Sequence, residues 1–423
     1  MAKKSKRRQK KDKQVRPNLP LEKETSSRRP EPRAEAPGKS KKIFLAAAVC
    51  AVVLIFAGLF FFFSRTKNKV KRDGGLNVLL FTLDTTRADH IGAYGYSRAK
   101  TPNIDSLALK GVRFANAYCP TPLTLPSHST IMTGTTPLYH KVRNNGTYTL
   151  GKDAVTLAER LKDAGYATSA FVSSFNVDSR FGLGQGFDYY DDNFNKDEML
   201  KTFRSERRAK DVADSFLRWF DANAGKKFFS WVHFYDPHLP YDPPSPYKEE
   251  FADSLYDGEI AYMDFHIGRI IEKLREKNIL DRTLIVLAGD HGEALGENDE
   301  VDHGIFIYDV TMKVPFIFYA GKNIPQGEVI NTKARLIDLM PTVLDLVKLP
   351  LNKEIQGISL VPYFEGRKKA DLVCYLETYF PLEDYGWSPL VGLVDGDWKY
   401  IEAPRPELYN LAEDRAEKKN VIA

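Results

Sequence analysis

Cysteine is scarce in this sequence: a chain of 423 residues has three, Cys50, Cys119 and Cys374, and they lie far apart. So few cysteines at such spacing exclude a disulfide-stabilised scaffold and a Cys-x-x-Cys metal site. Hydrophobic residues make up 43% of the chain and aromatic residues 12%. This composition excludes global disorder, and the length allows one large α/β domain or two to three small ones.

Positive charge is scarce outside the N-terminal region. The chain has 61 Lys+Arg and 56 Asp+Glu, but residues 1–42 hold 16 basic and 5 acidic residues, and residues 65–72 add 5 basic ones. This leaves 40 basic and 51 acidic residues beyond position 72, a net charge of −11. Because the basicity belongs to the tail, the sequence predicts no nucleic-acid partner.

A single long hydrophobic run, IFLAAAVCAVVLIFAGLFFFF, occupies residues 43–63 and contains 21 residues without a charge. At about 1.5 Å per residue a helix of this length spans the ~30 Å hydrocarbon core of a bilayer. A cleaved signal peptide is the alternative. It fits less well, because the run exceeds ~15 residues and is followed by SRTK where small residues are expected.

The charges around this run predict its orientation. The N-terminal flank, which ends in KSKK, is longer and denser in basic residues than the C-terminal one. The positive-inside rule then predicts a disordered cytoplasmic tail over 1–42, a transmembrane helix over 43–63 and a linker over 64–75. The rest would lie outside the cell membrane, in the periplasm or the extracellular space.

The body alternates apolar runs with helical segments that end at glycine. Strands are predicted at 76–84, 112–118, 166–174, 227–236, 283–290 and 313–321, and helices at 102–110, 153–164, 205–224 and 255–277. This alternation is typical of a doubly wound, mostly parallel α/β sheet, predicted here as the main domain over 76–350. The dipeptide Asp395-Gly396 indicates a hairpin, so a small antiparallel C-terminal subdomain is predicted over 351–423.

Acidic and imidazole side chains follow three of these strands. Asp84 and Asp290 each end a strand, and a third strand runs into Asp236-Pro237-His238. An isolated acid at a strand end is ordinarily a helix cap. Three such ends in one sheet instead favour a ligand site, because ligands bind at the carboxyl ends of parallel strands.

Several ordered stretches resemble the sulfatase branch of the alkaline phosphatase superfamily. They are NVLLFTLDTTRADHIGAYGY, TPNIDSLALKGVRFANAY, TLPSHSTIMTG, HFYDPHLPY, GDHGEALGE, DHGIFIYDVTMKVPFIF and ELYNLAEDRAEKKN. Together they cover roughly residues 76–420 in the order of the family. The resemblance implies an alkaline-phosphatase-like fold and a metal-dependent hydrolase that acts on sulfuric ester bonds.

The family's nucleophile motif, Cys/Ser-x-Pro-Ser/Ala-Arg, reads Thr124-Leu125-Pro126-Ser127-His128 here. Threonine cannot be oxidised to formylglycine, and the resemblance implies that Thr124 acts directly, as in phosphodiesterases and phosphotransferases of the superfamily. A threonine hydroxyl needs a base or a metal to become a nucleophile. The alternative is a helix N-cap, which is common for threonine before proline. His128 could replace the arginine of the motif as an oxyanion donor.

The resemblance also implies a metal site. Asp84, Asp290 and His291 match family ligands and would hold a divalent cation together with Thr124. Thr85 stands where the family often has a second acid, so a six-ligand calcium shell is not expected unchanged. The expected cofactor is a divalent metal ion, Ca, Zn, Mn or Mg, because aspartate and histidine bind hard to borderline cations.

Three further residues match catalytic positions of the family. His238 matches a histidine that contacts the transferred group or the leaving oxygen, and its alternative is a hydrogen-bonded loop histidine. His303 lies where relatives bind substrate with Lys or His; it could instead bind a second metal with Asp236. Asn145 matches an asparagine that binds a non-bridging oxygen, although Asn145-Gly146-Thr147 is also a glycosylation sequon.

These features predict a membrane-anchored metallohydrolase that cleaves a sulfate or phosphate ester, with an anionic ester as its partner. The rival is a phosphodiesterase or phosphotransferase acting on lipid head groups or envelope glycans, which the anchor favours. A third hypothesis, a non-catalytic scaffold, is disfavoured because Asp84, Thr124, Asp290 and His291 are all present. The sequence carries no signal of the oligomeric state.

Overall fold

The computed structural model describes residues 30, 49–53, 69–194 and 206–422. The predicted transmembrane segment 43–63 therefore lies largely outside the described residues. Within this segment residues 49–53 are described, and they are helical and exposed. Within the described ranges, no helix is both long enough and apolar enough to span a bilayer. The chain divides into two units, residues 1–61 and 62–423, and the second contains the folded body.

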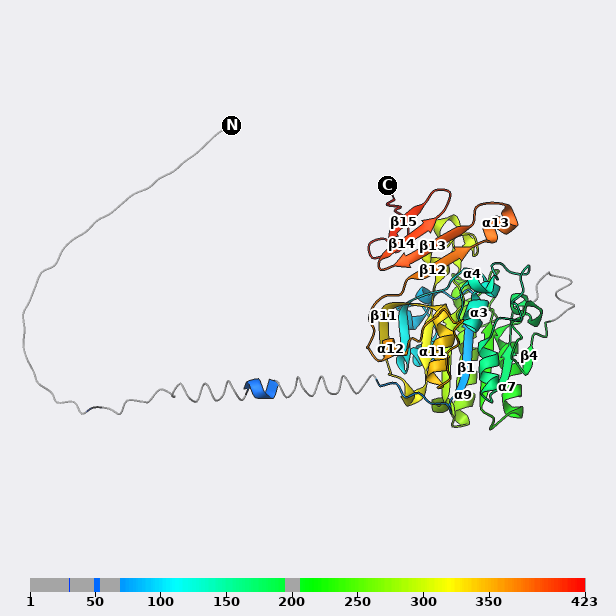
Figure 1. Ribbon diagram of the computed structural model, residues 1–423, viewed down its shortest axis with the longest axis vertical. Helices are drawn as coiled ribbons and strands as arrows, with labels where there is room; N and C mark the ends of the chain where they lie inside the picture. Colours follow the sequence, from blue (N-terminus) through cyan, green and yellow to red (C-terminus); the bar gives the residue numbers. More distant parts are fainter. Residues whose placement is uncertain (1–29, 31–48, 54–68, 195–205, 423) are drawn as a thin grey trace, which may run out of the picture. The chain divides into compact units, whose positions relative to one another are not determined.

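A nine-stranded sheet forms the centre of the body (Figure 1). Its order is β11-β2-β10-β6-β1-β5-β3-β4, with β9 paired to β2. Neighbouring strands run parallel, except that β9 and β10 are antiparallel to their partners. The strands are β1 Asn77–Leu83, β2 Val112–Tyr118, β3 Ala167–Phe171, β4 Tyr189–Asp191, β5 Phe228–Phe234, β6 Thr283–Gly289, β9 Lys313–Val314, β10 Phe316–Tyr319 and β11 Glu328–Arg335. The predicted mostly parallel α/β sheet is thus confirmed.

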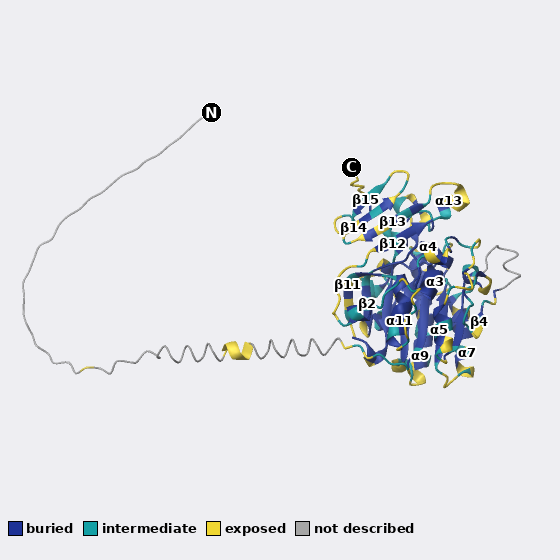
Figure 2. Cartoon of the chain, in the orientation of Figure 1, coloured by how far each residue is buried: buried dark blue, intermediate teal, exposed yellow. Residues whose placement is uncertain are grey.

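Helices cover both faces of this sheet, since alternate residues of β1 pack into two separate cores (Figure 2). The helices that contribute to one core are α2 Pro102–Leu109, α7 Ala209–Ala222 and α9 Leu255–Glu276. Those that contribute to the other are α3 Thr124–Thr133, α5 Leu157–Asp163, α11 Leu339–Leu346 and α12 Val361–Phe364. Short helices are α4 Pro137–His140, α8 Tyr247–Glu250, α10 Asp309–Met312 and α13 Phe380–Tyr385. A sheet buried on both faces explains why its strands are near-continuous apolar runs.

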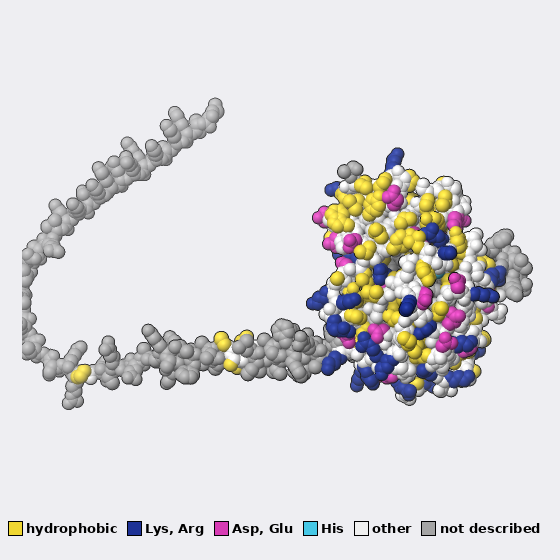
Figure 3. Space-filling view, viewed as in Figure 1, with side chains coloured by type: hydrophobic (Ala, Val, Ile, Leu, Met, Phe, Trp, Pro, Cys, Tyr) yellow, Lys and Arg dark blue, Asp and Glu magenta, His cyan; other side chains and the backbone are white. Residues whose placement is uncertain are grey.

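A four-stranded antiparallel sheet follows near the C-terminus, as predicted. Its strands are β12 Cys374–Thr378, β13 Leu390–Asp395, β14 Trp398–Glu402 and β15 Glu407–Asn410. Gly396 has a φ of 51° and turns β13 into β14, which confirms the predicted hairpin. Hydrophobic side chains gather over this sheet, whereas charges of both signs are scattered over the rest of the visible face (Figure 3).

Some predicted helix and strand boundaries differ from those in the structure, and some strands were not predicted. The helix predicted over 153–164 begins at Leu157, because Thr156 and Glu159 form a capping box. The strand predicted over 313–321 is split at Pro315, which lacks the N–H that a continuous ladder needs. Strand β11 was not predicted, and a two-stranded pair, β7 Ala294–Leu295 with β8 Val301–Asp302, forms in the loop after β6.

Candidate active site

Two aspartates extend neighbouring strands at the carboxyl edge of the sheet. The amide of Asp84 donates to the carbonyl of Phe234 at 2.9 Å, and that of Asp290 donates to the carbonyl of Leu83 at 3.3 Å. The ladder of β5, β1 and β6 therefore continues for one residue and places both carboxylates side by side. Ligand atoms of Asp84, Asp290 and His291 all lie within 4.8 Å of one another, and all three residues are buried.

Each aspartate keeps one oxygen unpartnered. Asp84 Oδ2 accepts from His233 Nε2 at 3.1 Å, and Asp290 Oδ1 accepts from the amides of Thr85 and His291 at 3.2 and 2.8 Å. Asp84 Oδ1 and Asp290 Oδ2, however, are buried without a hydrogen-bond partner. Burial raises the pKa of both carboxyls well above the usual range. A divalent cation fits this demand, since it would bind both free oxygens.

His291 supplies a nitrogen to the same space. Its Nδ1 donates to the carbonyl of Gly292 at 3.0 Å, which leaves the Nε2 lone pair free, 3.4 Å from Asp290 Oδ2. Burial lowers the pKa of His291 well below its ordinary value, so the ring is neutral, as a metal ligand must be. A Cβ at Gly292 would lie 2.1 Å from the carbonyl oxygen of Val310, which is why glycine follows the histidine here.

Thr124 begins helix α3 and faces the three ligands. Its Oγ1 lies 3.4 Å from His291 Nε2, and the side chain is fully buried. The N-cap of the helix is Leu123, and no side chain caps it, so the cap role considered for Thr124 is wrong. The hydroxyl of Ser127 donates to the carbonyl of Asp290 at 2.7 Å, which fixes the first turn of the helix against β6.

His128 lies behind Thr124 and is fully buried. Its Nδ1 donates to the carbonyl of Thr124 at 2.7 Å, and its Nε2 accepts from the hydroxyl of Thr82 at 3.0 Å. Both ring nitrogens are thus engaged inside the protein. The predicted oxyanion role of His128 does not match this geometry, and the residue instead positions the backbone of Thr124.

Asn145 and Thr85 flank the same site. Asn145 Oδ1 accepts from the amide of Leu125 at 2.9 Å, so this side chain holds the first turn of α3. The hydroxyl of Thr85 donates to the carbonyl of Pro237 at 2.7 Å and is therefore engaged outside the three-ligand cluster. Thr85 has a positive φ of 49°, which directs its amide toward Asp290.

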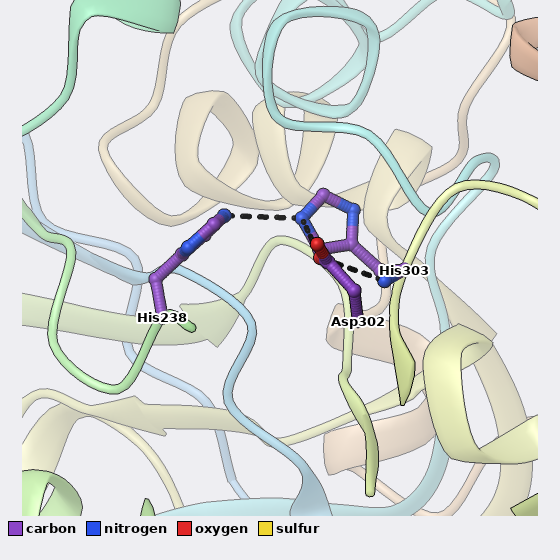
Figure 4. Close-up of side chains that lie close together, drawn as sticks. All are labelled: His238, Asp302 and His303. Carbon is purple, nitrogen blue, oxygen red and sulfur yellow. Dashed lines mark hydrogen bonds and ion pairs between the residues drawn. The ribbon is translucent and has the colours of Figure 1, made fainter. Parts of the chain in front are cut away.

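His238 and His303 come together beside the first cluster (Figure 4). Their Nε2 atoms are 3.1 Å apart, and the rings of His303 and His291 have centroids 4.3 Å apart. Asp302 joins them: its Oδ1 lies 3.4 Å from His303 Nε2. Asp236, the partner considered for His303, instead accepts from the amide of Ala209 at 2.8 Å. In the described part of the chain, His303 lies close to His238 and Asp302, and possible ligand atoms of these three residues are within 4.8 Å of one another.

Sequence reasoning missed two residues of this region, His233 and Asp302. His233 is buried in β5, and its Nδ1 accepts from the amide of Ser173 at 3.2 Å, so its Nε2 donates to Asp84. A histidine inside an otherwise apolar strand was the available signal. Asp302 directly precedes His303 in the DHG motif, where only the histidine was considered.

Comparisons with known proteins identify relatives of this chain. A family model described as Sulfatase matches residues 76–349, and one described as N-sulphoglucosamine sulphohydrolase, C-terminal, matches residues 296–423. An uncharacterised sulfatase of Escherichia coli is 26% identical over 82% of this chain and 83% of its own. An arylsulfatase of Clostridium perfringens is 24% identical over 69% of this chain and 79% of its own.

Solved structures share the fold. The crystal structure of a phosphonate monoester hydrolase of Agrobacterium radiobacter superposes with a TM-score of 0.71 at 23% identity. The match covers 82% of this chain and 91% of that one. At this identity the likeness concerns the architecture, an α/β sheet followed by an antiparallel C-terminal sheet.

Proposed function

The chain belongs to the sulfatase family and is an enzyme of the sulfuric ester hydrolase type, and on that premise we propose that it cleaves a sulfate or phosphate ester with the Thr124 hydroxyl as nucleophile. One observation carries the proposal. Thr124 Oγ1 lies at the start of a helix, 3.4 Å from His291 Nε2, beside two buried carboxylate oxygens without partners. A hydroxyl in this place can reach both a cation and a substrate.

Asp84, Asp290, His291 and Thr124 would hold the divalent cation that the family uses. When bound, the cation supplies Lewis-acid polarisation and lowers the pKa of a neighbouring hydroxyl. The protein keeps the ligands ready for it: His233 orients Asp84, two backbone amides orient Asp290, and a carbonyl fixes the tautomer of His291.

The proposed reaction has two displacements. Thr124 Oγ loses its proton and forms a bond to sulfur or phosphorus, the bond to the ester oxygen breaks, and the leaving oxygen takes up one proton, so that the alcohol leaves and the protons balance. Water then attacks the Thr124 ester, which releases inorganic sulfate or phosphate and restores the hydroxyl. His238 and His303 would contact the transferred group or the leaving oxygen, and Asn145 would keep the amides of the first turn of α3 in place.

Phosphoryl chemistry is the second candidate, and the nucleophile favours it. Threonine cannot become the formylglycine on which sulfatases with Cys or Ser at this position depend. A phosphodiesterase, or a phosphotransferase acting on lipid head groups or envelope glycans, would use Thr124 directly. Both candidates would pass through a covalent ester of Thr124, which is a sulfate ester in one and a phosphate ester in the other. A hydrolase would then transfer the group to water, and a phosphotransferase would transfer it to an alcohol.

Substitution of Thr124 tests the nucleophile. Thr124→Ala should lower turnover by roughly 10³-fold or more, because the attacking oxygen is lost. Thr124→Ser keeps a hydroxyl and should retain part of the activity. Rates on an aryl sulfate and an aryl phosphodiester would show which ester is preferred, with Thr147→Ala in a nearby exposed loop as the control. Equal turnover by Thr124→Ala and the parent would contradict the proposal.

The membrane anchor belongs to the same proposal. The 21-residue apolar run at 43–63 and the basic tail before it favour one transmembrane helix with the catalytic body on the periplasmic or extracellular side. Protease added to spheroplasts, or to intact cells that have no outer membrane, should then remove the body and leave the tail protected. Protection of the body in these cells, with digestion after lysis, would contradict this orientation.

A further inference from the structure

The chain enters its folded body at the amino edge of the large sheet, where the parallel strands begin. The amide of Lys71 donates to the carbonyl of Asn323 at 2.7 Å, and that of Asp73 donates to the carbonyl of Leu346 at 2.8 Å. Asn323 follows β10, which runs antiparallel to β6, and Leu346 ends α11. Shortly after Asp73, β1 begins at Asn77. These contacts fix the entering segment at the amino edge.

The candidate active site lies at the opposite edge. Asp84 is seven residues beyond Asn77, and at about 3.3 Å per residue of strand it is ~23 Å from the amino edge. Asp84 and Thr124 are fully buried, so the surface above the site is farther away still. The C-terminal sheet packs against this edge, because the amide of Glu377 donates to the carbonyl of Pro120 at 2.8 Å. The entry of the chain and the site are therefore at opposite ends of the body.

The connection between the apolar run and the body is short. The run ends at Phe63, and Lys71 is eight residues further on, so the connection spans at most about 29 Å when fully extended. If the site faced the anchoring bilayer, the connection would have to cover the ~23 Å from the site to the amino edge and a head-group layer of about 5–7 Å. These two distances use its full length before the depth of the site is counted. A body on its side would still keep Thr124 behind helices about 10 Å thick.

Exposed lysines lie around the amino edge. They occupy the segments between helices and the strands that follow them, or the segments next to the entering chain: Lys110, Lys226, Lys277, Lys322 and Lys348. Lysine side chains are attracted to an anionic lipid surface. The amino edge is thus suited to lie against lipid head groups, although the chain beyond position 72 carries a net charge of −11.

We propose that the amino edge of the large sheet faces the bilayer that anchors the chain, and that the site opens away from it. The substrate is then a water-soluble anionic ester that reaches the site from the aqueous phase. Lipid head groups of the anchoring bilayer, the substrates of the rival function, would lie out of reach. The proposal rests on the ester cleavage and on the anchor proposed above.

Fluorescence quenching tests the orientation without any substrate. The full-length chain with Cys50→Ala would be reconstituted into vesicles of phosphatidylcholine and phosphatidylglycerol that contain a head-group quencher. A fluorophore attached in Lys322→Cys, at the amino edge, should be quenched severalfold more than one attached in Val301→Cys, at an exposed position of β8. Equal quenching of the two, stronger quenching in Val301→Cys, or a chain that does not stay with the vesicles would overturn the proposal.

A longer connection tests the substrate. About twenty Gly and Ser residues inserted after Asn68 would lengthen the reach, and the same insertion after Gly38, in the basic tail, is the matched control. A soluble aryl ester would be compared with the same ester carrying an acyl chain in the same vesicle. The parent and both insertion variants should cleave the soluble ester equally, and all should cleave the acylated ester in detergent. In vesicles only the variant extended after Asn68 should cleave the acylated ester at a similar rate.

The outcomes separate this proposal from the proposed function. Equal cleavage of the acylated ester in vesicles by the parent and by the variant extended after Asn68 would overturn the orientation. It would leave ester hydrolysis standing. Failure of every chain to cleave the soluble ester would instead contradict the proposed function, and the quenching measurement would still decide the orientation.

Discussion

Two buried charged clusters in this protein differ in what balances them. In the C-terminal part, Lys399 is fully buried, and its Nζ forms ion pairs with Asp309 at 3.0 Å and Glu417 at 2.8 Å. At the carboxyl edge of the large sheet, Asp84 and Asp290 are just as buried, but their neighbours are neutral histidines and each keeps an oxygen without a partner. In one cluster a lysine of the chain balances the acids, whereas in the other the acids have no lysine or arginine among their described ion-pair partners and could bind a cation.

The difference separates structure from function. Buried charges are costly, so a chain keeps them where they are paired or where they bind something. The Lys399 cluster joins β14 to α10 and to the C-terminal segment, and its loss should therefore affect folding. The Asp84–Asp290 cluster is proposed to bind a cation for the reaction, and its loss should therefore affect chemistry more than folding. The four predictions that follow test this separation, beginning with the largest expected effect.

Removal of the proposed cation at Asp84, Asp290 and His291 should abolish activity. Asp290→Asn, or exhaustive chelation of the parent, should lower turnover by roughly 10³-fold or more, because the site loses the positive charge that activates the nucleophile. In the presence of chelator, Asp290→Asn should also unfold at a higher temperature than the parent, since one of two unpaired buried carboxylates is gone. Calorimetry and turnover would be measured on the same samples. Full turnover after chelation would refute this interpretation.

Removal of the Lys399 ammonium group should damage the fold instead. Lys399→Met removes the ammonium group that pairs with half-buried Asp309 and buried Glu417, and should lower the free energy of unfolding by about 3–5 kcal/mol. Metal content of the folded protein should not change. Denaturant unfolding compared with Lys418→Met, at an exposed lysine nearby, would measure the effect. Loss of metal without loss of stability in Lys399→Met would mean that the two clusters are not separate.

A smaller effect is expected at His233, which orients Asp84 but is not itself a proposed ligand of the cation. His233→Phe removes the hydrogen bond to Asp84 Oδ2 and should weaken metal binding by about 10–100-fold. His233→Gln keeps a donor and should restore part of the affinity. Competition titration with a metal-binding indicator would compare the affinities of the variants and the parent. Equal affinity in His233→Phe and the parent would show that Asp84 needs no such support.

The smallest effect concerns a third buried acid, Asp264 of α9. It accepts from the amide of Ile104 at 2.8 Å and from Asn103 Nδ2 at 2.8 Å, and burial raises its pKa to about 7. The folded protein therefore binds more protons than the unfolded chain between pH 3.8 and about 7. Stability from this group is complete below that window and is lost as the pH rises through it. Asp264→Asn should show a flatter dependence of melting temperature on pH between 5 and 8; an unchanged slope would contradict this.

Much of the fold could be predicted because its signals are local. Apolar runs such as 76–84 and 283–290, each ending in aspartate, are strands in the structure, and Asp395-Gly396 is the hairpin it predicted. The Thr156 capping box and the break at Pro315 also depend on residues close together in the sequence, although neither was predicted. Strand β11 could not be predicted in the same way, because its EVINTKAR sequence is mostly polar and pairs only with β2.

The sequence by itself determined which side chains stand at the ends of strands and at the start of α3. The predicted strand ends pointed to Asp84 and Asp290, and the motifs that resemble the sulfatase family added Thr124 and His291. Only the tertiary structure decided which loops meet. It brought Asp302, and not Asp236, to His303, engaged His128 behind Thr124, and placed His233 under Asp84. These contacts join segments from separate strands and loops, and their closeness depends on how the whole sheet twists and packs, which no local pattern records.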